Sequence, residues 1–451
     1  MFTLLLNLGI IEKALITAAF LGILCGMFGT FIVLRKISLV GDAVSHALLP
    51  GIVLGFIFST MLGYDREPLI ILLCALAVGL LAIWLMKKLE STTRIKSDAA
   101  LGIVLSGFFG LGLFMKSSLK EFMSFAGGIE SYLFGNIATI SNGDFYTLMI
   151  TGVILIGVTF LFLRPLVLVS FDEQFTSGIG FPKTLLHLLF YGILTMTIVV
   201  SVQAVGVILV SALLIIPAST AFLLTDRKST MLWLAMAFGA AAGLAGALVS
   251  IYVKGVNVPS GAAMTLASAS LFFTAYFFAP KYGVLAKFIN HRNTAREIAI
   301  DNSLKWIFKN NEPCGDIMAA LTNEEFSTQY NSPTHCSKAH LKLLQSKGYI
   351  TLSNKLDLQE IQLTQKGQNR GAKIVRNHRI WELYLAQQAD YRPDHVHDDA
   401  EIMEHIIDEA TVERIAAELG HPETDPHGMP IPMASHLPTD PSNSSTPNPV
   451  N

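Results

Sequence analysis

Two residues that can bind a metal lie four positions apart inside an apolar stretch of the chain. Asp42 and His46 belong to "GDAVSHALLPG", residues 41–51, in one of the most apolar parts of the sequence. On a helix, residues i and i+4 share a face, so the carboxylate and the imidazole can reach one ion. This pair suits a first-row divalent metal better than Na⁺ or K⁺. The spacing leaves one alternative open, a polar pair that is solvated at the end of a membrane span.

A second group of acidic residues and histidines lies near the C-terminus. It occupies "NHRIWELYL" and "HVHDDAEIMEH", where several of its members are again three or four positions apart. Two helices that carry such faces can build an oxygen and nitrogen site for Mn²⁺ or Fe²⁺. A solvated acidic face with ordinary surface histidines is the alternative. The candidate ligands are His378, Glu382, His397, Glu401, Glu404 and His405.

The elements that must position these residues differ between the two parts of the chain. Of the 451 residues 52 % are hydrophobic and 15 % are charged, which fits a protein that is part membrane and part soluble. Up to about Ala279 the sequence is a series of apolar runs, each long enough to cross a hydrocarbon core of about 30 Å as a helix. We expect nine spans, near residues 9–34, 39–62, 67–86, 98–115, 145–168, 184–202, 205–225, 230–252 and 259–279.

Basic residues orient these spans. Most of them fall on one side of the membrane if the spans alternate, and the positive-inside rule makes that side the cytoplasm. The N-terminus is then outside and everything after Lys281 is in the cytoplasm, with Lys116 and Lys120 as a small violation. The orienting residues are Arg35, Lys36, Lys87, Lys88, Arg94, Lys96, Arg227, Lys228, Lys281 and Lys287.

Net charge and cysteine content exclude some classes of protein. The net charge of −2 gives no overall basic field for nucleic acid, so any such patch must be local. The cysteines Cys25, Cys74, Cys314 and Cys336 form no CxxC pair, which argues against a disulfide framework and a cysteine zinc site.

A predicted cytoplasmic loop could serve a partner protein. Residues 170–182, "SFDEQFTSGIGFP", combine acidic residues, a short amphipathic turn, two glycines and a proline, which could form a surface helix. An ordinary loop is the alternative. The chain has no GxxxxGK[ST] phosphate loop, so we do not expect it to hydrolyse ATP.

Several of these stretches resemble the metal-type ABC transporter permease family. They are "GMFGTFIVLRKISLVGDAVSHALLPG", "SDAALGIVLSGFFGLG", "SYLFGNI", "SFDEQFTSGIG" and "VGVILVSALLIIPASTAFLL", in order over residues 10–280. The resemblance implies import of manganese, zinc or iron(II) with a separate ATPase, an extracytoplasmic metal-binding protein and a second permease chain, either a copy or a paralogue. It implies that Asp42 and His46 line the metal path. The implied ATPase-coupling loop contains Phe171, Asp172, Glu173, Phe175, Gly178 and Gly180.

Four further residues are candidates for positions in the path or its gate. They are Ser45, Ser211, Pro217 and Thr220. For these residues we favour the alternative, which is helix packing and a proline kink.

Residues 295–363 have the pattern of a winged helix-turn-helix. "IAIDNSLKWIFKNN" and "CGDIMAALT" read as helices, a third helix begins near "SPTHCSKAHLKLLQSKGYI", and "YITLS" with "LQEIQLT" reads as a hairpin. The third helix would enter a major groove of DNA. A winged-helix fold used only for protein contacts is the alternative. The DNA-facing candidates are Thr334, Ser337, Lys338 and Lys342.

Residues 293–432 resemble the diphtheria-toxin-repressor type of iron- or manganese-dependent regulators. The resemblance rests on "HRIWELYL", "VHDDAEIMEH", "VERIAAELGHPETDPHGMPIP" and the winged helix before them. It implies an operator-binding dimer with bound Fe²⁺ or Mn²⁺, and a glutamate at position 401 favours manganese. It assigns an ancillary site to His378, Glu382 and His397, and much of the primary site to Glu401, Glu404 and His405.

The first helix of this regulator family also supplies metal ligands. The matching stretch here is "DNSLK", with Asp301, Asn302 and Lys305. A charged lysine cannot coordinate a metal, and an asparagine is a poor ligand.

We therefore expect an all-α polytopic membrane domain followed by a soluble winged helix-turn-helix and a helical dimerisation and metal-binding domain. The expected boundaries are 1–280, a linker at 281–294, 295–363, 364–432, and a disordered tail at 433–451. The regulator could be released by proteolysis in the linker, or it could sense cytoplasmic metal and gate transport without binding DNA. An ion-coupled secondary transporter and a membrane-tethered regulator without transport are two further alternatives.

Overall fold

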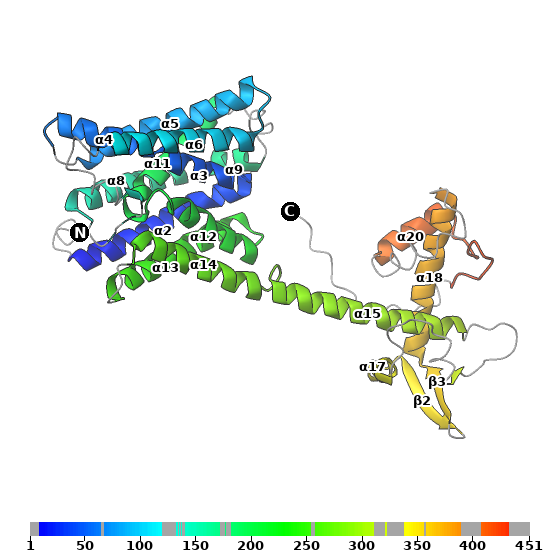
Figure 1. Ribbon diagram of the computed structural model, residues 1–451. Coiled ribbons are helices and arrows are strands. Elements are labelled where there is room, and N and C mark those ends of the chain that lie inside the picture. Colours follow the sequence, from blue (N-terminus) through cyan, green and yellow to red (C-terminus); the bar gives the residue numbers. More distant parts are fainter. Residues whose placement is uncertain are drawn as a thin grey trace. The chain divides into compact units, whose positions relative to one another are not determined.

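The computed structural model divides into two compact units, Met1–Lys287 and Phe288–Asn451, which we call unit 1 and unit 2 (Figure 1). The structure describes residues 9–64, 67–119, 132–133, 135, 137, 140–171, 176, 182–253, 258–310, 321–322, 338–355, 358–388 and 407–432.

In the described residues of unit 1, the regular secondary structure is helical. Its helices are α2 (Ile10–Arg35), α3 (Ser38–Ala47), α4 (Leu49–Met61), α5 (Pro68–Thr92), α6 (Ser97–Leu119), α8 (Asn142–Leu161), α9 (Leu163–Phe171), α11 (Lys183–Val205), α12 (Val210–Leu224), α13 (Lys228–Tyr252) and α14 (Ser260–Phe278). Figure 1 shows α5 and α6 on one side of this unit, α13 and α14 on the other, and α2, α3 and α11 between them.

The described residues contain eight helical segments that are long and apolar enough to cross a membrane, with α3 and α4 together forming one of them. These segments correspond to eight of the nine predicted spans. The ninth, predicted at 205–225, is the 15-residue helix α12. Gly206 ends α11 with φ 94°, which glycine adopts readily, and a turn follows before α12 begins at Val210. Fifteen residues make a helix of only about 22 Å.

Small residues let α2 and α13 pack with their backbones in close contact. A Cβ atom added at Gly22 would lie 2.0 Å from the carbonyl oxygen of Gly239 on α13. A Cβ atom added at Gly26 would lie 2.1 Å from the carbonyl oxygen of Ala235. Close approach through small residues is typical of helix pairs in membranes, where apolar side chains gain little by leaving lipid.

The paired segments α3 and α4 are separated at Leu48. Pro50 lies in the first turn of α4. It has no N–H to donate to the carbonyl group four residues earlier, which belongs to His46. The chain therefore changes helix directly after the polar motif, and residues 42–46 occupy a short helix of their own.

Unit 2 combines helices with a three-stranded antiparallel sheet of order β1-β3-β2. In the sheet, Ile350 pairs with Leu363 and Leu352 pairs with Ile361. The elements are α15 (Val284–Asn310), which begins in unit 1, then β1 (Leu321–Thr322), α17 (Lys338–Ser346), β2 (Ile350–Lys355), β3 (Leu358–Leu363), α18 (Gln365–Gln388) and α20 (Glu409–Glu418).

The predicted third helix and hairpin correspond to α17, β2 and β3, whereas the predicted second helix, 314–322, differs from the structure. Its last two residues form strand β1, where Leu321 pairs with Ile361 and Thr322 with Glu360. This pairing gives β3 a second neighbour, so long-range strand contact overrides the local helical pattern. Residues 314–320 lie outside the described part of the chain.

Two small hydrophobic clusters hold the described part of unit 2 together. The first joins α15, α17 and the sheet through Leu304, Leu344 and Ile361. The second joins α18, α20 and the segment after α20 through Ile380, Val412 and Ile431. Helix α18 therefore lies between the sheet-containing half and the C-terminal half of unit 2.

Candidate metal sites

Asp42 and His46 lie close together on α3, at the distance expected for one helical turn. His46 Nε2 lies 3.7 Å from Asp42 Oδ1, and the side chains are 17 % and 38 % exposed respectively. The His46 ring packs edge-on against Phe109 of α6, with 5.0 Å between ring centres. Among the described residues, His46 Nδ1 is buried and has no hydrogen-bond partner. His46 Nε2 and the partly exposed carboxylate of Asp42 that it faces form a set of donors that fits a divalent metal.

A third polar group reaches this pair from α12. Ser211 Oγ lies 2.9 Å from Asp42 Oδ1 and donates a hydrogen bond to it. Ser45 turns away, since its hydroxyl donates to the backbone carbonyl of Asp42 within α3. Thr220 likewise bonds to the carbonyl of Ile216 in its own helix. Of the three hydroxyl groups, that of Ser211 is therefore the one that donates to the carboxylate of Asp42.

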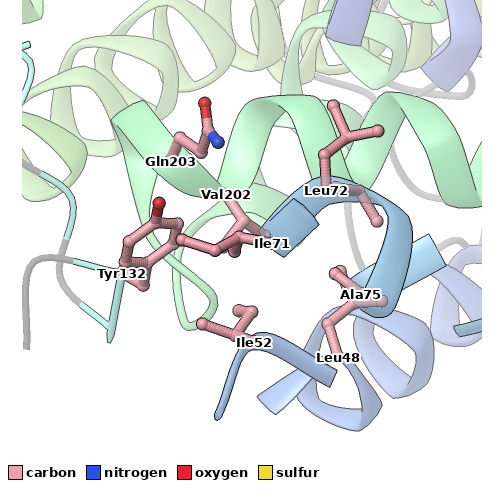
Figure 2. Close-up of a pocket in the computed structure, with 9 residues that line it drawn as sticks. Leu48, Ile52, Ile71, Leu72, Ala75, Tyr132, Val202 and Gln203 are labelled. Carbon is pink, nitrogen blue, oxygen red and sulfur yellow. The ribbon is translucent and has the colours of Figure 1, made fainter. Parts of the chain in front are cut away.

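A small pocket lies beside this region, between α4, α5 and α11. Figure 2 shows its lining, in which Tyr132 and Gln203 are the polar side chains. The rest of the lining is apolar and includes Leu48, Ile52 and Ile71. Among the described residues this lining contains no carboxylate or imidazole, so it does not repeat the donor set of Asp42 and His46.

Unit 2 brings Glu382 together with two residues that sequence reasoning missed. Ligand atoms of Glu382, Asp425 and His427 all lie within 4.8 Å of one another. Glu382 and Asp425 are buried, whereas His427 is exposed. Two carboxylates and an imidazole at this separation form a donor set that fits Mn²⁺ or Fe²⁺.

The turn that carries Asp425 is held by its own backbone and by a buried arginine. Asp425 Oδ1 accepts hydrogen bonds from the backbone N–H groups of His427 and Met429, each at 2.8 Å. Arg379 Nε lies 3.4 Å from Asp425 Oδ2, and Arg379 Nη1 donates to the carbonyl of Pro430 at 2.6 Å. These contacts hold the turn against α18 at Arg379, the residue that follows His378.

His378 lies between Glu382 and a lysine from α15. His378 Nε2 is 2.8 Å from Glu382 Oε1, and both side chains are almost fully buried. Lys305 Nζ is 3.2 Å from His378 Nδ1. The first helix of the predicted regulator therefore reaches the metal-binding region with an amine.

Another pair fixes α15 to α18 one turn away. Arg370 donates two hydrogen bonds to Asp301, at 3.1 Å from Nε and 2.7 Å from Nη2. Burial lowers the pKa of Arg370, but the hydrogen bonds and charge of Asp301 outweigh this effect and raise the pKa above its ordinary value. The two-bond geometry holds the helices in a defined register.

Comparison with known proteins decides what unit 1 is. Residues 7–279 match the family described as "ABC 3 transport family". The chain belongs to the ABC 3 transport family. Its relatives include the "Manganese transport system membrane protein MntC" of Bacillus subtilis (strain 168), which is 33 % identical over 82 % of this chain and 82 % of the relative.

Two further relatives of this ABC 3 family chain define how far the similarity extends. A "Probable metal transport system membrane protein" of Chlamydia trachomatis is 27 % identical, and the match covers 90 % of this chain and 92 % of the relative. The solved structure "PsaBC from Streptococcus pneumoniae in complex with Fab" is 36 % identical and has a TM-score of 0.54, over 62 % of this chain and 95 % of that one.

The ABC 3 permease also carries a second recognised domain. Residues 364–433 match the family described as "Iron dependent repressor, metal binding and dimerisation domain". The expected fusion of a metal-type ABC permease with a metal-dependent regulator domain is thereby confirmed.

Several predicted site residues of the permease lie outside the described residues. Phe171 ends α9, and the remaining coupling-loop residues are not described: Asp172, Glu173, Phe175, Gly178 and Gly180. Helix α9 is tied to the bundle just before this loop. Arg35 Nη2 donates to the carbonyl of Val169 at 3.3 Å, and the Arg35 guanidinium lies 4.1 Å from the centre of the Phe190 ring.

Much of the predicted regulator site also lies outside the described residues. Of the six predicted metal ligands the structure places His378 and Glu382, and the others are not described: His397, Glu401, Glu404 and His405. Of the DNA-facing candidates, Thr334 and Ser337 are not described, Lys338 begins α17, and Lys342 lies exposed on that helix.

One feature of the sequence around Asp425 and His427 predicts a tight turn there. They flank Pro426 in "TDPHGMP", and Gly428 has φ 80°, which turns the chain tightly after them. Their closeness to Glu382 is a tertiary contact across more than forty residues of sequence, and helical spacing cannot reveal such a contact.

Proposed function

We propose that this chain is the permease subunit of an ABC importer for a first-row divalent metal. The single observation that carries the proposal is the donor set of Asp42 and His46 on a short helix inside a membrane bundle of the ABC 3 family. Mn²⁺ and Fe²⁺ are the leading candidates, with Zn²⁺ as a third, since carboxylate and imidazole ligands suit all of them. The name of the Bacillus subtilis relative favours Mn²⁺.

The driving force comes from a separate ATPase subunit. The chain has no GxxxxGK[ST] loop of its own. We assign ATPase docking to residues 171–181, which begin at the last residue of α9. An extracytoplasmic metal-binding protein delivers the ion, and a second permease chain completes the pathway. The permease spans the plasma membrane of a bacterium several times, with unit 2 in the cytoplasm, as the distribution of basic residues indicates.

Transport is tested by metal uptake in cells that lack their own manganese importer. Expression of this chain with its ATPase and its binding protein is expected to restore ⁵⁴Mn²⁺ uptake. Omission of the ATPase is expected to abolish it. Uptake that persists without the ATPase would instead indicate an ion-coupled secondary transporter.

For unit 2 we propose a metal-dependent repressor that reads the cytoplasmic concentration of the imported ion. Glu382, Asp425 and His427 supply a donor set for Mn²⁺ or Fe²⁺. Helix α17, with Lys342 exposed, is the element that would enter the major groove of operator DNA, and unit 2 would act as a dimer. Repression of uptake genes when metal is plentiful is the simplest logic for such a fusion.

A repressor that stays attached to the membrane reaches little of the chromosome. We propose that unit 2 is released by proteolysis in the segment around residues 281–300. Immunoblotting with an antibody against the C-terminus tests this step, because release produces a short fragment at some metal level. Full-length protein alone at every metal level would exclude release.

The second candidate is a gate, in which metal-loaded unit 2 contacts the ATPase and stops transport without binding DNA. Arg35 and the α9 contact give the coupling region a defined link to the bundle, through which such a gate could act. A chain without residues 293–451 is then expected to escape inhibition by internal metal. Inhibition that is unchanged in this truncated chain excludes the gate.

A further inference from the structure

The first turns of α15 carry an exposed apolar surface. It consists of four exposed side chains, which are those of Val284, Leu285, Phe288 and Ile289, and Phe288 is 63 % exposed. Positions i, i+1, i+4 and i+5 lie on one side of a helix, so these side chains form a single surface, which we call the apolar face. Adjacent exposed apolar residues of this kind mark a contact with a protein or a membrane.

Basic residues accompany the apolar face. The stretch "PKYGVLAKFINHRNTAR", residues 280–296, has no aspartate or glutamate and four basic residues: Lys281, Lys287, Arg292 and Arg296. Arg292 and Arg296 follow Phe288 at intervals of four, so they continue the same side of the helix, and both are exposed. The first acidic residue is Glu297, nine positions after Phe288 and therefore on the opposite side. The surface is complementary to a partner that is apolar and negatively charged.

The apolar face begins next to a membrane span. Helix α14 is one of the segments that are long and apolar enough to cross a membrane, and it ends at Phe278. Helix α15 starts at Val284, after the short turn 279–283. Tyr276, Phe278 and Tyr282 are exposed around this turn. Exposed aromatic residues are typical of the boundary between membrane and water, which places the start of α15 at that boundary.

Contacts within unit 1 fix the position of this turn. Lys281 Nζ lies 2.6 Å from Asp226 Oδ2, and the Tyr282 hydroxyl donates to Asp226 Oδ1 at 2.7 Å. Asp226 lies in the connection between α12 and α13. The turn is also tight, since a Cβ atom added at Gly283 would lie 2.4 Å from the carbonyl oxygen of Ala279. The chain therefore leaves the helix bundle at a defined place, and the charge of Lys281 is balanced there by Asp226.

We propose that residues 284–296 form an interfacial helix that binds anionic phospholipid headgroups at the membrane surface where α14 ends. The apolar face enters the boundary between headgroups and acyl chains, and Arg292 and Arg296 bind lipid phosphates. A lipid surface fits better than a protein partner, because α14 brings the segment to the headgroups and no acidic side chain opposes them. The inference requires only that α14 crosses the membrane, so it is independent of the metal that is transported or sensed.

The test is hydrogen exchange, measured by mass spectrometry, of the full-length chain in lipid nanodiscs. One set of nanodiscs contains phosphatidylcholine alone, and the other contains phosphatidylcholine with phosphatidylglycerol. Binding to the anionic surface stabilises the first turns of α15, so we expect the amides of residues 285–292 to exchange more slowly with phosphatidylglycerol. Added salt is expected to reduce this difference, because it screens exposed charges.

Two substitutions test the two parts of the surface. Arg292→Gln is expected to lower the protection by phosphatidylglycerol about fivefold, the usual contribution of one basic residue at an anionic membrane. Phe288→Gln is expected to lower it about tenfold, since it removes the largest side chain of the apolar face. Asn290→Gln is the control on the opposite side of the helix. Lys373→Gln removes one positive charge from a pair on another helix of unit 2.

Three results would overturn the proposal. The first is equal exchange of residues 285–292 in the two kinds of nanodisc. The second is the same protection in detergent without phospholipid, which would assign the apolar face to another part of the chain or to a second copy. The third is an equal loss of protection in Arg292→Gln and Lys373→Gln, or in Phe288→Gln and Asn290→Gln. Metal uptake is measured separately, so none of these results bears on the proposed transport.

Discussion

Ser211 on α12 donates a hydrogen bond to Asp42 on α3, with 2.9 Å between Ser211 Oγ and Asp42 Oδ1. The same carboxylate oxygen lies 3.7 Å from His46 Nε2. A hydroxyl donor orients the carboxylate without neutralising its charge, so Asp42 keeps its attraction for a cation. The candidate metal path is therefore built from two helices that are far apart in the sequence.

Loss of this hydroxyl is expected to weaken transport without stopping it. Ser211→Ala leaves Asp42 in place but removes its orienting partner, and such partners typically contribute about 10- to 100-fold in metal affinity. We expect a higher KM for Mn²⁺ uptake with a smaller change in the maximal rate. Thr159→Val is the control, because the hydroxyl of the buried Thr159 donates to the carbonyl of Leu155 in its own helix. An unchanged KM in Ser211→Ala would remove Ser211 from the path.

The contact between α2 and α13 makes a prediction about stability. Gly22→Ala places a methyl group where the Gly239 carbonyl now lies, so the helices must move apart. Overpacking of this kind typically costs about 1–3 kcal/mol. Gly107→Ala on α6 is the matched control, because an added Cβ there meets no atom within 4 Å. Thermal unfolding in detergent should show a lower melting temperature for Gly22→Ala alone, and equal values would contradict the close packing.

The buried arginine of unit 2 makes a second prediction about stability. Arg379→Met leaves Asp425 buried without the guanidinium, and the loss of one partner from a buried ion pair costs about 3–5 kcal/mol. Lys373→Met removes a partly exposed pair, whose loss is expected to cost about 0–1 kcal/mol. Hydrogen exchange of the α18 and α20 backbone measures both effects. Similar exchange in the two variants would show that Arg379 does not hold this region.

The role of His427 as a metal ligand is tested by substituting two histidines of the same segment, His427 and His421. His427→Gln is expected to lower Mn²⁺ affinity, since it removes an imidazole ligand from the set with Glu382 and Asp425. His421→Asn is the control, because His421 is exposed, lies outside this cluster, and has φ 53°, which asparagine tolerates. Isothermal titration with Mn²⁺ compares the two variants. Equal affinities would exclude His427 as a ligand.

Much of the fold could be read from the sequence because its strongest signals are local. Apolar runs long enough to cross a membrane predict the eight long segments, and the stretches "YITLS" and "LQEIQLT" predict the hairpin. The length of α12 was less accessible, since a single glycine, Gly206, ends α11 within an uninterrupted apolar run.

The candidate sites could be predicted only where their residues are neighbours on one helix. Asp42 with His46, and His378 with Glu382, are spaced by four and lie together in the structure. Ser211, Asp425 and His427 reach these pairs from other elements, and only the packing of helices and the turn at Gly428 brings them there. The sequence shows that Lys305 departs from the regulator pattern, but its contact with His378 is visible only in the structure.

The central claim is tested most directly by ⁵⁴Mn²⁺ uptake through Asp42→Asn, which keeps the size of the side chain and removes its charge. The variant is expressed with the ATPase and the binding protein, and its amount in the membrane is matched to the wild type. The account predicts that uptake falls to the level of cells without the permease. Uptake equal to that of the wild type would contradict it.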